Sequence, residues 1–216
     1  MSTTGMTSER TRTRMVERLA QMGIQDPHVL NAMRHVPRHL FVDEALATRA
    51  YDDVSLPIGH GQTISQPYIV ARMTELLLGG ETLHNVLEIG TGCGYQTAVL
   101  LAAKISQVYS IERLAPILEL ARRNLRAARA VHARLVHGDG SQGLAETAPF
   151  DGIIVTAAAE KVPMVLLEQL KEGGRLIMPV GDETQQYLWS FKKTPQGVQQ
   201  KRIEPVKFVP LLTGKA

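Results

Sequence analysis

Apolar positions in the first third of the chain recur at the spacing of amphipathic helices. Over residues 9–22 they predict a first helix, and a second begins at residues 26–27, where an N-cap aspartate precedes a proline. This second helix should end before Pro37, and a third should run over residues 65–78. The apolar face of the first helix consists of Met15, Val16, Leu19 and Met22.

Residues 51–66, with the sequence YDDVSLPIGHGQTISQ, lack any periodic pattern and contain the turn formers Pro57, Gly59 and Gly61. We predict a long loop here, and long loops within compact domains are often functional. Residues 1–8 are small and polar and are predicted to be disordered.

From residue 84 onward, short apolar strands alternate with helices. This rhythm predicts an α/β, Rossmann-like fold, in which a mostly parallel sheet carries helices on both faces. Around residues 194–197, a turn between two strand-like runs predicts an antiparallel C-terminal hairpin. We expect one domain over residues 9–216, with an N-terminal helical extension at 9–83 and the sheet at 84–216. Strands are predicted at 84–89, 107–111, 133–138, 152–157 and 174–180, and helices near 95–103, 114–127 and 162–170.

Composition adds few constraints. Hydrophobic residues make up 44% of the chain and the formal net charge is +3. Cys93 is the single cysteine, so no intramolecular disulfide can form, and no apolar run approaches membrane-spanning length. We therefore expect a cytoplasmic protein without a membrane partner. The arginines at residues 10–18 fit a solvated first helix, so no nucleic-acid partner is expected, and the seven histidines have no metal-ligand spacing.

The sharpest local motif is a strand that ends in a glycine turn, VLEIGTGCGY at residues 86–95. A dinucleotide fingerprint requires glycine at its sixth position, where this chain has Tyr95. Glu88 would oppose a pyrophosphate but would favour a methionine moiety that carries an ammonium and a sulfonium. Alternatively, Glu88 is a strand-end carboxylate bonded to local amides. The three glycines that would let a ligand approach the backbone are Gly90, Gly92 and Gly94.

Two more acids end the next two predicted strands. Glu112 lies 18 positions after Gly94 and could accept hydrogen bonds from ribose hydroxyls, or it could be a helix N-terminal acid. Asp139, between Gly138 and Gly140, could accept from an adenine amine, or it could belong to a plain Asp-Gly turn. Acids at the ends of three successive strands favour a nucleoside-type cofactor at one edge of the sheet.

From about Met15 to Val209 the chain resembles the protein-L-isoaspartate (D-aspartate) O-methyltransferases. The glycine turn is common to many methyltransferases, whereas the stretch QTISQP at residues 62–67 is specific to this family. The other stretches that carry the resemblance are residues 15–19, 36–38, 41–42, 138–140 and 170–176.

The resemblance implies a class I methyltransferase fold and S-adenosylmethionine as cofactor. It also implies methylation of the free carboxylate of L-isoaspartyl residues in damaged proteins and peptides, with D-aspartyl residues as further candidates, and this methylation initiates repair through a succinimide. Ser65 would be the active-site residue, and Thr63, Ile64 and Ser65 would contact the substrate carboxylate. The cofactor would be held by Glu88, Gly90, Gly92, Gly94, Glu112, Asp139 and Gly140.

The chemistry of methyl transfer agrees with this site. A carboxylate is already ionised at neutral pH and needs no general base, and neutral donors suit a transition state in which charges partly cancel. Residues 61–68 offer such donors and no cation, although Ser65 could merely cap the following helix. Thr156, Ala157 and Ala158 are small residues that either leave room for a substrate backbone or simply pack.

Other functions remain as alternatives. A class I methyltransferase could act on another carboxylate, on a small molecule or on RNA, but RNA would favour exposed aromatic residues, and these make up only 5% of the chain. Glu88 and Tyr95 count against a nicotinamide dehydrogenase. A non-catalytic protein that keeps this fold is a further alternative. We expect a monomer that needs no metal.

Overall fold

The computed structural model describes residues 9–216, so the disorder predicted for residues 1–8 lies outside the described residues. The helices are α1 (Glu9–Gln21), α2 (Pro27–His35), α3 (Pro67–Leu78), α4 (Tyr95–Ala102), α5 (Ala115–Ala127) and α6 (Met164–Glu168). The strands are β1 (Leu56–Gly59), β2 (Gln62–Ile64), β3 (Asn85–Ile89), β4 (Gln107–Glu112), β5 (Arg134–His137), β6 (Phe150–Val155), β7 (Leu170–Gly181), β8 (Gln186–Thr194) and β9 (Gly197–Val206).

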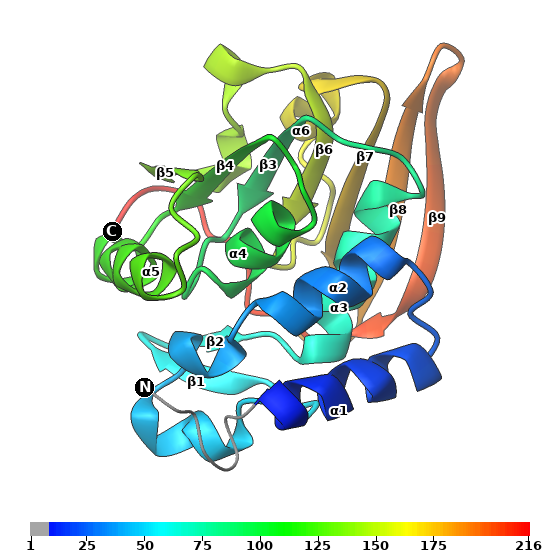
Figure 1. The fold of residues 1–216 in the computed structure, drawn as a ribbon. Coiled ribbons are helices and arrows are strands. Elements are labelled where there is room, and N and C mark those ends of the chain that lie inside the picture. Colours follow the sequence, from blue (N-terminus) through cyan, green and yellow to red (C-terminus); the bar gives the residue numbers. More distant parts are fainter. Residues whose placement is uncertain (1–8) are drawn as a thin grey trace.

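Seven strands form one sheet in the order β5-β4-β3-β6-β7-β8-β9 (Figure 1). The first five of these pair in parallel, whereas β8 and β9 pair antiparallel, as the sequence pattern predicts. The chain moves outward to β4 and β5 on one side of β3 and returns to β6 on the other. The carboxyl ends of the strands therefore open a crevice beside β3, where open α/β sheets bind their ligands.

The helix boundaries follow local chemistry. Asp26 caps α2 by accepting hydrogen bonds from the backbone N–H groups of His28 and Val29, and Pro27 occupies the first turn. Helix α3 begins at Pro67, and its cap residue Gln66 forms no capping bond with its side chain.

Residues 51–66 differ from the prediction, because they are not one long loop. Leu56–Gly59 and Gln62–Ile64 pair as the antiparallel hairpin β1–β2, which Figure 1 shows below the main sheet. His60 and Gly61 both have positive φ angles and form its tight turn. Strands of four and three residues are too short to show an alternating pattern, so only the turn formers between them are visible in the sequence.

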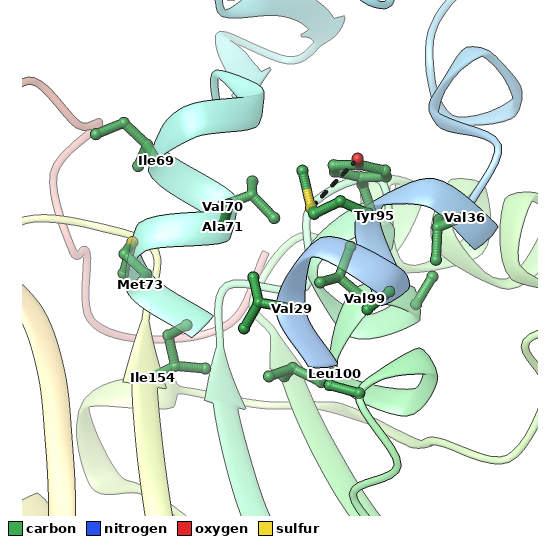
Figure 2. Close-up of a cluster of buried hydrophobic side chains, with 14 of the residues drawn as sticks. Val29, Val36, Ile69, Val70, Ala71, Met73, Tyr95, Val99, Leu100 and Ile154 are labelled. Atoms are coloured by element: carbon green, nitrogen blue, oxygen red, sulfur yellow. Dashed lines mark hydrogen bonds between the residues drawn. The ribbon is translucent and has the colours of Figure 1, made fainter. Parts of the chain in front are cut away.

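Two hydrophobic clusters fill the two faces of the sheet. Val86 and Ile154 face the cluster beneath α1–α4, while their neighbours Leu87 and Ile153 face the cluster that includes α6. Figure 2 shows the first cluster, in which side chains of α2, α3 and α4 meet above the sheet. Within residues 9–216, no helix has the length and apolar character needed to span a bilayer.

Candidate functional site

A pocket opens at the carboxyl ends of β3, β4 and β6, and the segment from β2 to the start of α3 forms its outer wall. It encloses about 930 Å³, counted together with the solvent at its open mouth. Most of the residues predicted from the sequence lie in its wall. They are Thr63, Ile64, Ser65, Gly90, Gly92, Glu112, Gly140, Thr156 and Ala157.

The glycine turn after β3 needs its first glycine for steric reasons. Gly90 has a φ of +93°, and a Cβ placed there would lie 2.3 Å from the hydroxyl oxygen of Thr156. That hydroxyl donates to the carbonyl oxygen of Gly90 at 2.7 Å, which ties the turn to the end of β6. The backbone of Gly90 and Gly92 is consequently bare toward the pocket.

Glu112, at the end of β4, braces this turn. Its carboxylate accepts one hydrogen bond from the backbone N–H of Gly92 and one from that of Leu114, each at 3.0 Å. The side chain is buried and borders the pocket, and a carboxylate has about four lone-pair sites, so it keeps capacity for ligand hydroxyls. The two interpretations of Glu112 are therefore compatible, since it holds the start of α5 and also faces the pocket.

Glu88 does not line the pocket, so its carboxylate is not placed for the direct contact with a ligand that the sequence suggests. The hydroxyl groups of Thr97 and Ser110 both donate to its Oε2, and its Oε1 has no partner among the residues that the structure describes. Burial is complete and raises the pKa of Glu88 to about 8, although the two hydroxyl donors lower it. The alternative of bonds to local amides is also wrong, because hydroxyl groups bind this carboxylate.

Asp139 also lies outside the wall. Its Oδ1 accepts from the backbone N–H and the hydroxyl of Ser141, and its Oδ2 accepts from the backbone N–H of Gly214 at 2.6 Å. Desolvation opposes ionisation, but the bonds from Gly214 and Ser141 outweigh it and lower the pKa of Asp139. In this structure Asp139 anchors the C-terminal segment, and only its neighbour Gly140 borders the pocket.

Two small residues from the predicted set also serve the scaffold. A Cβ on Gly94 would lie 3.0 Å from the side chain of Leu125, so this glycine allows close packing against α5. The backbone of Ala158 exchanges hydrogen bonds with Val209 and Leu211.

These bonds of Ala158 place residues 209–212 in the pocket wall, a segment that sequence reasoning missed. No local pattern marks it, because it folds against β6 only in the tertiary structure.

Ser65 lies between β2 and α3 and borders two adjoining pockets. The second pocket is lined by residues of the loop before β1, the start of α3 and the segment 205–209. Four residues line both pockets, and all of them are uncharged. They are Thr63, Ser65, Thr156 and Val209.

The Ser65 hydroxyl does not cap α3, since the helix has no side-chain capping bond at its N-cap. Instead, the carboxylate of Asp53 accepts from the N–H of Tyr68 in the first turn, at 2.8 Å. The helix-cap interpretation of Ser65 is therefore wrong, and its hydroxyl is available to a ligand.

Titratable groups elsewhere do not suggest a different chemistry. Burial raises the pKa of Cys93 to about 11, so this thiol is protonated and is a poor nucleophile at neutral pH. Within residues 9–216, no cluster of three or more His, Cys, Asp or Glu residues could hold a metal ion.

Comparison with known proteins decides between the remaining interpretations. The model of the protein-L-isoaspartate (D-aspartate) O-methyltransferase family matches residues 10–216. The chain belongs to this family. It is 68% identical over 211 residues to the protein-L-isoaspartate O-methyltransferase of Chromobacterium violaceum, covering 98% of this chain and 94% of that protein. The corresponding protein of Methylobacillus flagellatus is 60% identical over 218 residues, covering 99% and 97%.

Solved structures agree with this family assignment. A protein-L-isoaspartate O-methyltransferase from Plasmodium falciparum, in complex with S-adenosyl-L-homocysteine, superposes with a TM-score of 0.81 at 27% identity. The match covers 93% of this chain and 98% of that one. The fold class and the methyltransferase activity expected from the sequence are confirmed, and the dehydrogenase and the other substrate classes are not favoured.

Proposed function

We propose that this chain transfers a methyl group from S-adenosylmethionine to the free carboxylate of L-isoaspartyl residues, with Ser65 as the substrate-positioning catalytic residue. The observation that carries the assignment of Ser65 is its position in the wall of both pockets. The inner pocket, beneath the glycine turn, takes the cofactor. The outer pocket takes the peptide, so that its carboxylate meets the cofactor at Ser65.

The polar and apolar groups that line the inner pocket match the groups of the cofactor. Glu112 would accept from the ribose hydroxyls, and the bare backbone of Gly90 and Gly92 would leave room for the methionine moiety. Ile89 and Ile111 provide an apolar surface for the base, with Gly140 leaving room for a flat ring. When bound, S-adenosylmethionine supplies an electrophilic methyl group on a sulfonium and leaves as the neutral thioether.

Glu88 contributes from behind this wall. Its pKa of about 8 keeps the buried side chain mainly protonated at neutral pH, so Glu88 acts on the pocket only through the hydrogen bonds that tie α4 and β4 to β3. Gly94 and Asp139 act on the cofactor only through the elements that they hold, α5 and the C-terminal segment.

The protein accelerates the reaction by alignment and by excluding water, since the substrate carboxylate needs no base. Thr63 and Ser65 offer neutral hydroxyl donors, and Ile64 closes the wall between them. A cation at this junction would stabilise the separated charges of the ground state more than the transition state, in which these charges partly cancel. The uncharged set that lines both pockets satisfies this requirement.

Substrate selection extends to the outer pocket. Thr156 and Ala157 present small side chains at the junction, and Ala158 fixes the segment at residues 209–211 that forms the facing wall. Isoaspartyl proteins and peptides are the partners, with D-aspartyl residues as further substrates. The proposal includes a cytoplasmic location and no nucleic-acid partner. It also includes a monomer, because one chain contains every residue that this mechanism uses.

Replacement of the Ser65 hydroxyl tests this assignment. Ser65→Ala should lower the rate of methyl transfer to an isoaspartyl peptide by on the order of a hundredfold, the cost of losing one well-placed donor. Affinity for S-adenosylhomocysteine, measured by calorimetry, and the Tm should stay unchanged, because the hydroxyl caps no helix. Ser106→Ala, which alters an exposed hydroxyl far from both pockets, is the control. A Ser65→Ala enzyme with full activity would remove Ser65 from the mechanism.

A further inference from the structure

Positive charge is concentrated in one segment of the chain. Residues 113–137 contain six arginines, one glutamate and no lysine. With histidines counted as neutral, this segment has a net charge of +5, which exceeds the +3 of the whole chain and leaves −2 for all other residues. Arginine presents a planar fork of donors that matches a carboxylate. A segment with arginine and no lysine therefore suits bidentate pairing with anions.

Three of these arginines lie on α5, two flank it, and Arg134 lies on β5, which is the edge strand at one end of the sheet (Figure 1). Arg123, Arg126 and Arg129 are exposed, and within residues 9–216 none of the three has an ion pair. Arg122 pairs with Glu119, and Arg134 lies over the ring of Tyr109. The charge of the three exposed arginines is therefore available to a partner.

A shallow groove with an apolar floor lies among these charges. Leu125, Ala130 and Leu135 line it together with Arg122 and Arg126. Val131 also lines the groove and is 58% exposed, so it adds to the apolar surface among these charges. We call this groove and its flanking residues Arg123, Arg129 and Arg134 the α5–β5 surface. A partner that fits it combines carboxylates with aliphatic side chains.

The backbone supplies a second observation. Arg129 follows the end of α5 with a φ of +57°, a left-handed conformation that favours glycine and disfavours arginine. The bond from the N–H of Ala130 to the carbonyl of Leu125 closes the helix end around it. A cation thus occupies a position where glycine would be more stable, so glycine can replace it without loss of stability.

The α5–β5 surface is connected to the active site through α5. Arg113 and Leu114 border the cofactor pocket, and the helix starts at the next residue. At about 1.5 Å per residue, the helical and trailing arginines at residues 122–129 lie about 10–20 Å along this helix. A folded protein bound at the active site can extend over this distance, whereas a peptide of two or three residues, at most about 3.6 Å each, cannot.

We propose that the α5–β5 surface is a docking site for acidic protein substrates, which is separate from the pocket that holds the isoaspartyl residue. This proposal rests on the proposed function. When an asparagine becomes an isoaspartyl residue, a neutral amide is replaced by a carboxylate, so damaged proteins gain negative charge. The aliphatic floor favours a protein over a nucleic acid, whose bases stack on aromatic rings that the groove lacks.

Charge reversal tests the proposal, with an acidic isoaspartyl protein and a short neutral isoaspartyl peptide as the two substrates. The variant R123E/R126E/R129E should raise KM for the protein about tenfold at low salt and leave kcat and the peptide kinetics unchanged. The matched control R10E/R14E/R34E makes the same change in net charge on exposed residues of α1 and α2. Equal effects of the two variants on KM, or no effect of the first, would overturn the proposal.

Two further measurements separate the remaining explanations. Binding of single-stranded RNA or duplex DNA that R123E/R126E/R129E abolishes, with unchanged KM for the protein, would make the surface a nucleic-acid site and overturn the proposal. If the unmodified enzyme does not methylate the isoaspartyl peptide, this result would instead contradict the proposed function, independently of docking.

The left-handed position offers a second, independent variant. Arg129→Gly should raise the Tm and also raise KM for the acidic protein by about threefold, the loss of one exposed charge contact. Lys104→Gly is its control, because Lys104 is an exposed cation with a φ of +67° after α4. It should raise the Tm without any change in KM. An unchanged KM for Arg129→Gly would remove Arg129 from the docking site.

Discussion

The acids that follow the central strands occupy different environments, and their roles differ accordingly. Glu112 borders the pocket and braces the glycine turn, Glu88 is sealed behind the turn, and Asp139 holds the C-terminal segment. All three sit at the carboxyl edge of the sheet, yet only one can meet a ligand directly. At the scale of single residues, burial and hydrogen-bond partners therefore decide function more than sequence position does.

Glu112 gives the most direct test of the cofactor site. Glu112→Ala should lower affinity for S-adenosylhomocysteine at least about tenfold, because each hydrogen bond to a charged acceptor contributes about 1.5–3 kcal/mol. Calorimetry measures the affinity, and circular dichroism checks that the fold is kept. Glu112→Gln retains an acceptor for the N–H of Gly92 and should lose less. Unchanged affinity in Glu112→Ala would leave Glu112 with only its bonds to Gly92 and Leu114.

Glu88 predicts a pH dependence of stability. Burial raises its pKa from 4.5 to about 8, so between these values the folded protein keeps a proton that the unfolded chain has released. Stability should therefore fall as pH rises from about 4.5 through 8. The side chain of Glu88→Gln stays neutral at every pH, so the variant does not lose this stability. The Tm of the variant minus that of the unmodified protein should therefore increase from pH 5 to pH 8. A difference that does not change with pH would mean that Glu88 titrates normally.

At the scale of elements, short connections position the chemistry on a rigid sheet. The glycine turn joins β3 to α4, and the β1–β2 hairpin delivers Ser65 to the mouth of the pocket. Asp53, from the loop before this hairpin, holds the first turn of α3 through the N–H of Tyr68. The position of Ser65 is thus set from both sides, by the hairpin before it and by the anchored helix after it.

The glycine turn predicts a steric effect. Gly90→Ala should reduce cofactor affinity more than tenfold and destabilise the protein by about 1–3 kcal/mol, because the new Cβ meets the Thr156 hydroxyl at 2.3 Å and the φ is +93°. Calorimetry and thermal unfolding measure the two effects. Gly80→Ala shares a positive φ, of +79°, but its Cβ would have open space. It should lose some stability and no cofactor affinity, and equal losses of affinity would argue against the clash.

At the scale of the whole molecule, we propose that the adjoining pockets determine which carboxylate is methylated. An isoaspartyl residue extends the backbone through its side chain and leaves the α-carboxylate free, one methylene closer to the chain than an aspartyl carboxylate. In this proposal, the facing walls at the start of α3 and at residues 205–209 would hold the peptide backbone at a set distance from Ser65. A displacement of about 1 Å can cost a hundredfold in rate.

The enzyme should therefore prefer an isoaspartyl peptide over its aspartyl isomer by on the order of a hundredfold or more in kcat/KM. Free amino acids should be poor substrates, because they lack the backbone that the outer pocket holds. A base-labile methyl ester, measured with labelled cofactor, reports the product. Equal rates on the two isomeric peptides would mean that the outer pocket does not select the carboxylate by its distance from the backbone.

The sequence by itself determined the order and type of the elements of the sheet. Apolar strands, helical periodicity and the glycine turn are local patterns, and local backbone preference together with burial suffices to read them. The predicted helix near 162–170 shortens to α6 at Met164–Glu168, and β7 starts earlier, at Leu170, because pairing with β6 overrides the weak local signal at the boundary.

The tertiary structure alone decided which of the predicted residues face the ligand. Glu88 and Glu112 both end neighbouring parallel strands, but the turn covers the first and leaves the second at the pocket. Residues 209–212 join the wall, and Asp139 is recruited by Gly214, through contacts between segments far apart in the chain. Such contacts depend on how elements pack in space, and no periodic pattern of neighbouring residues encodes them.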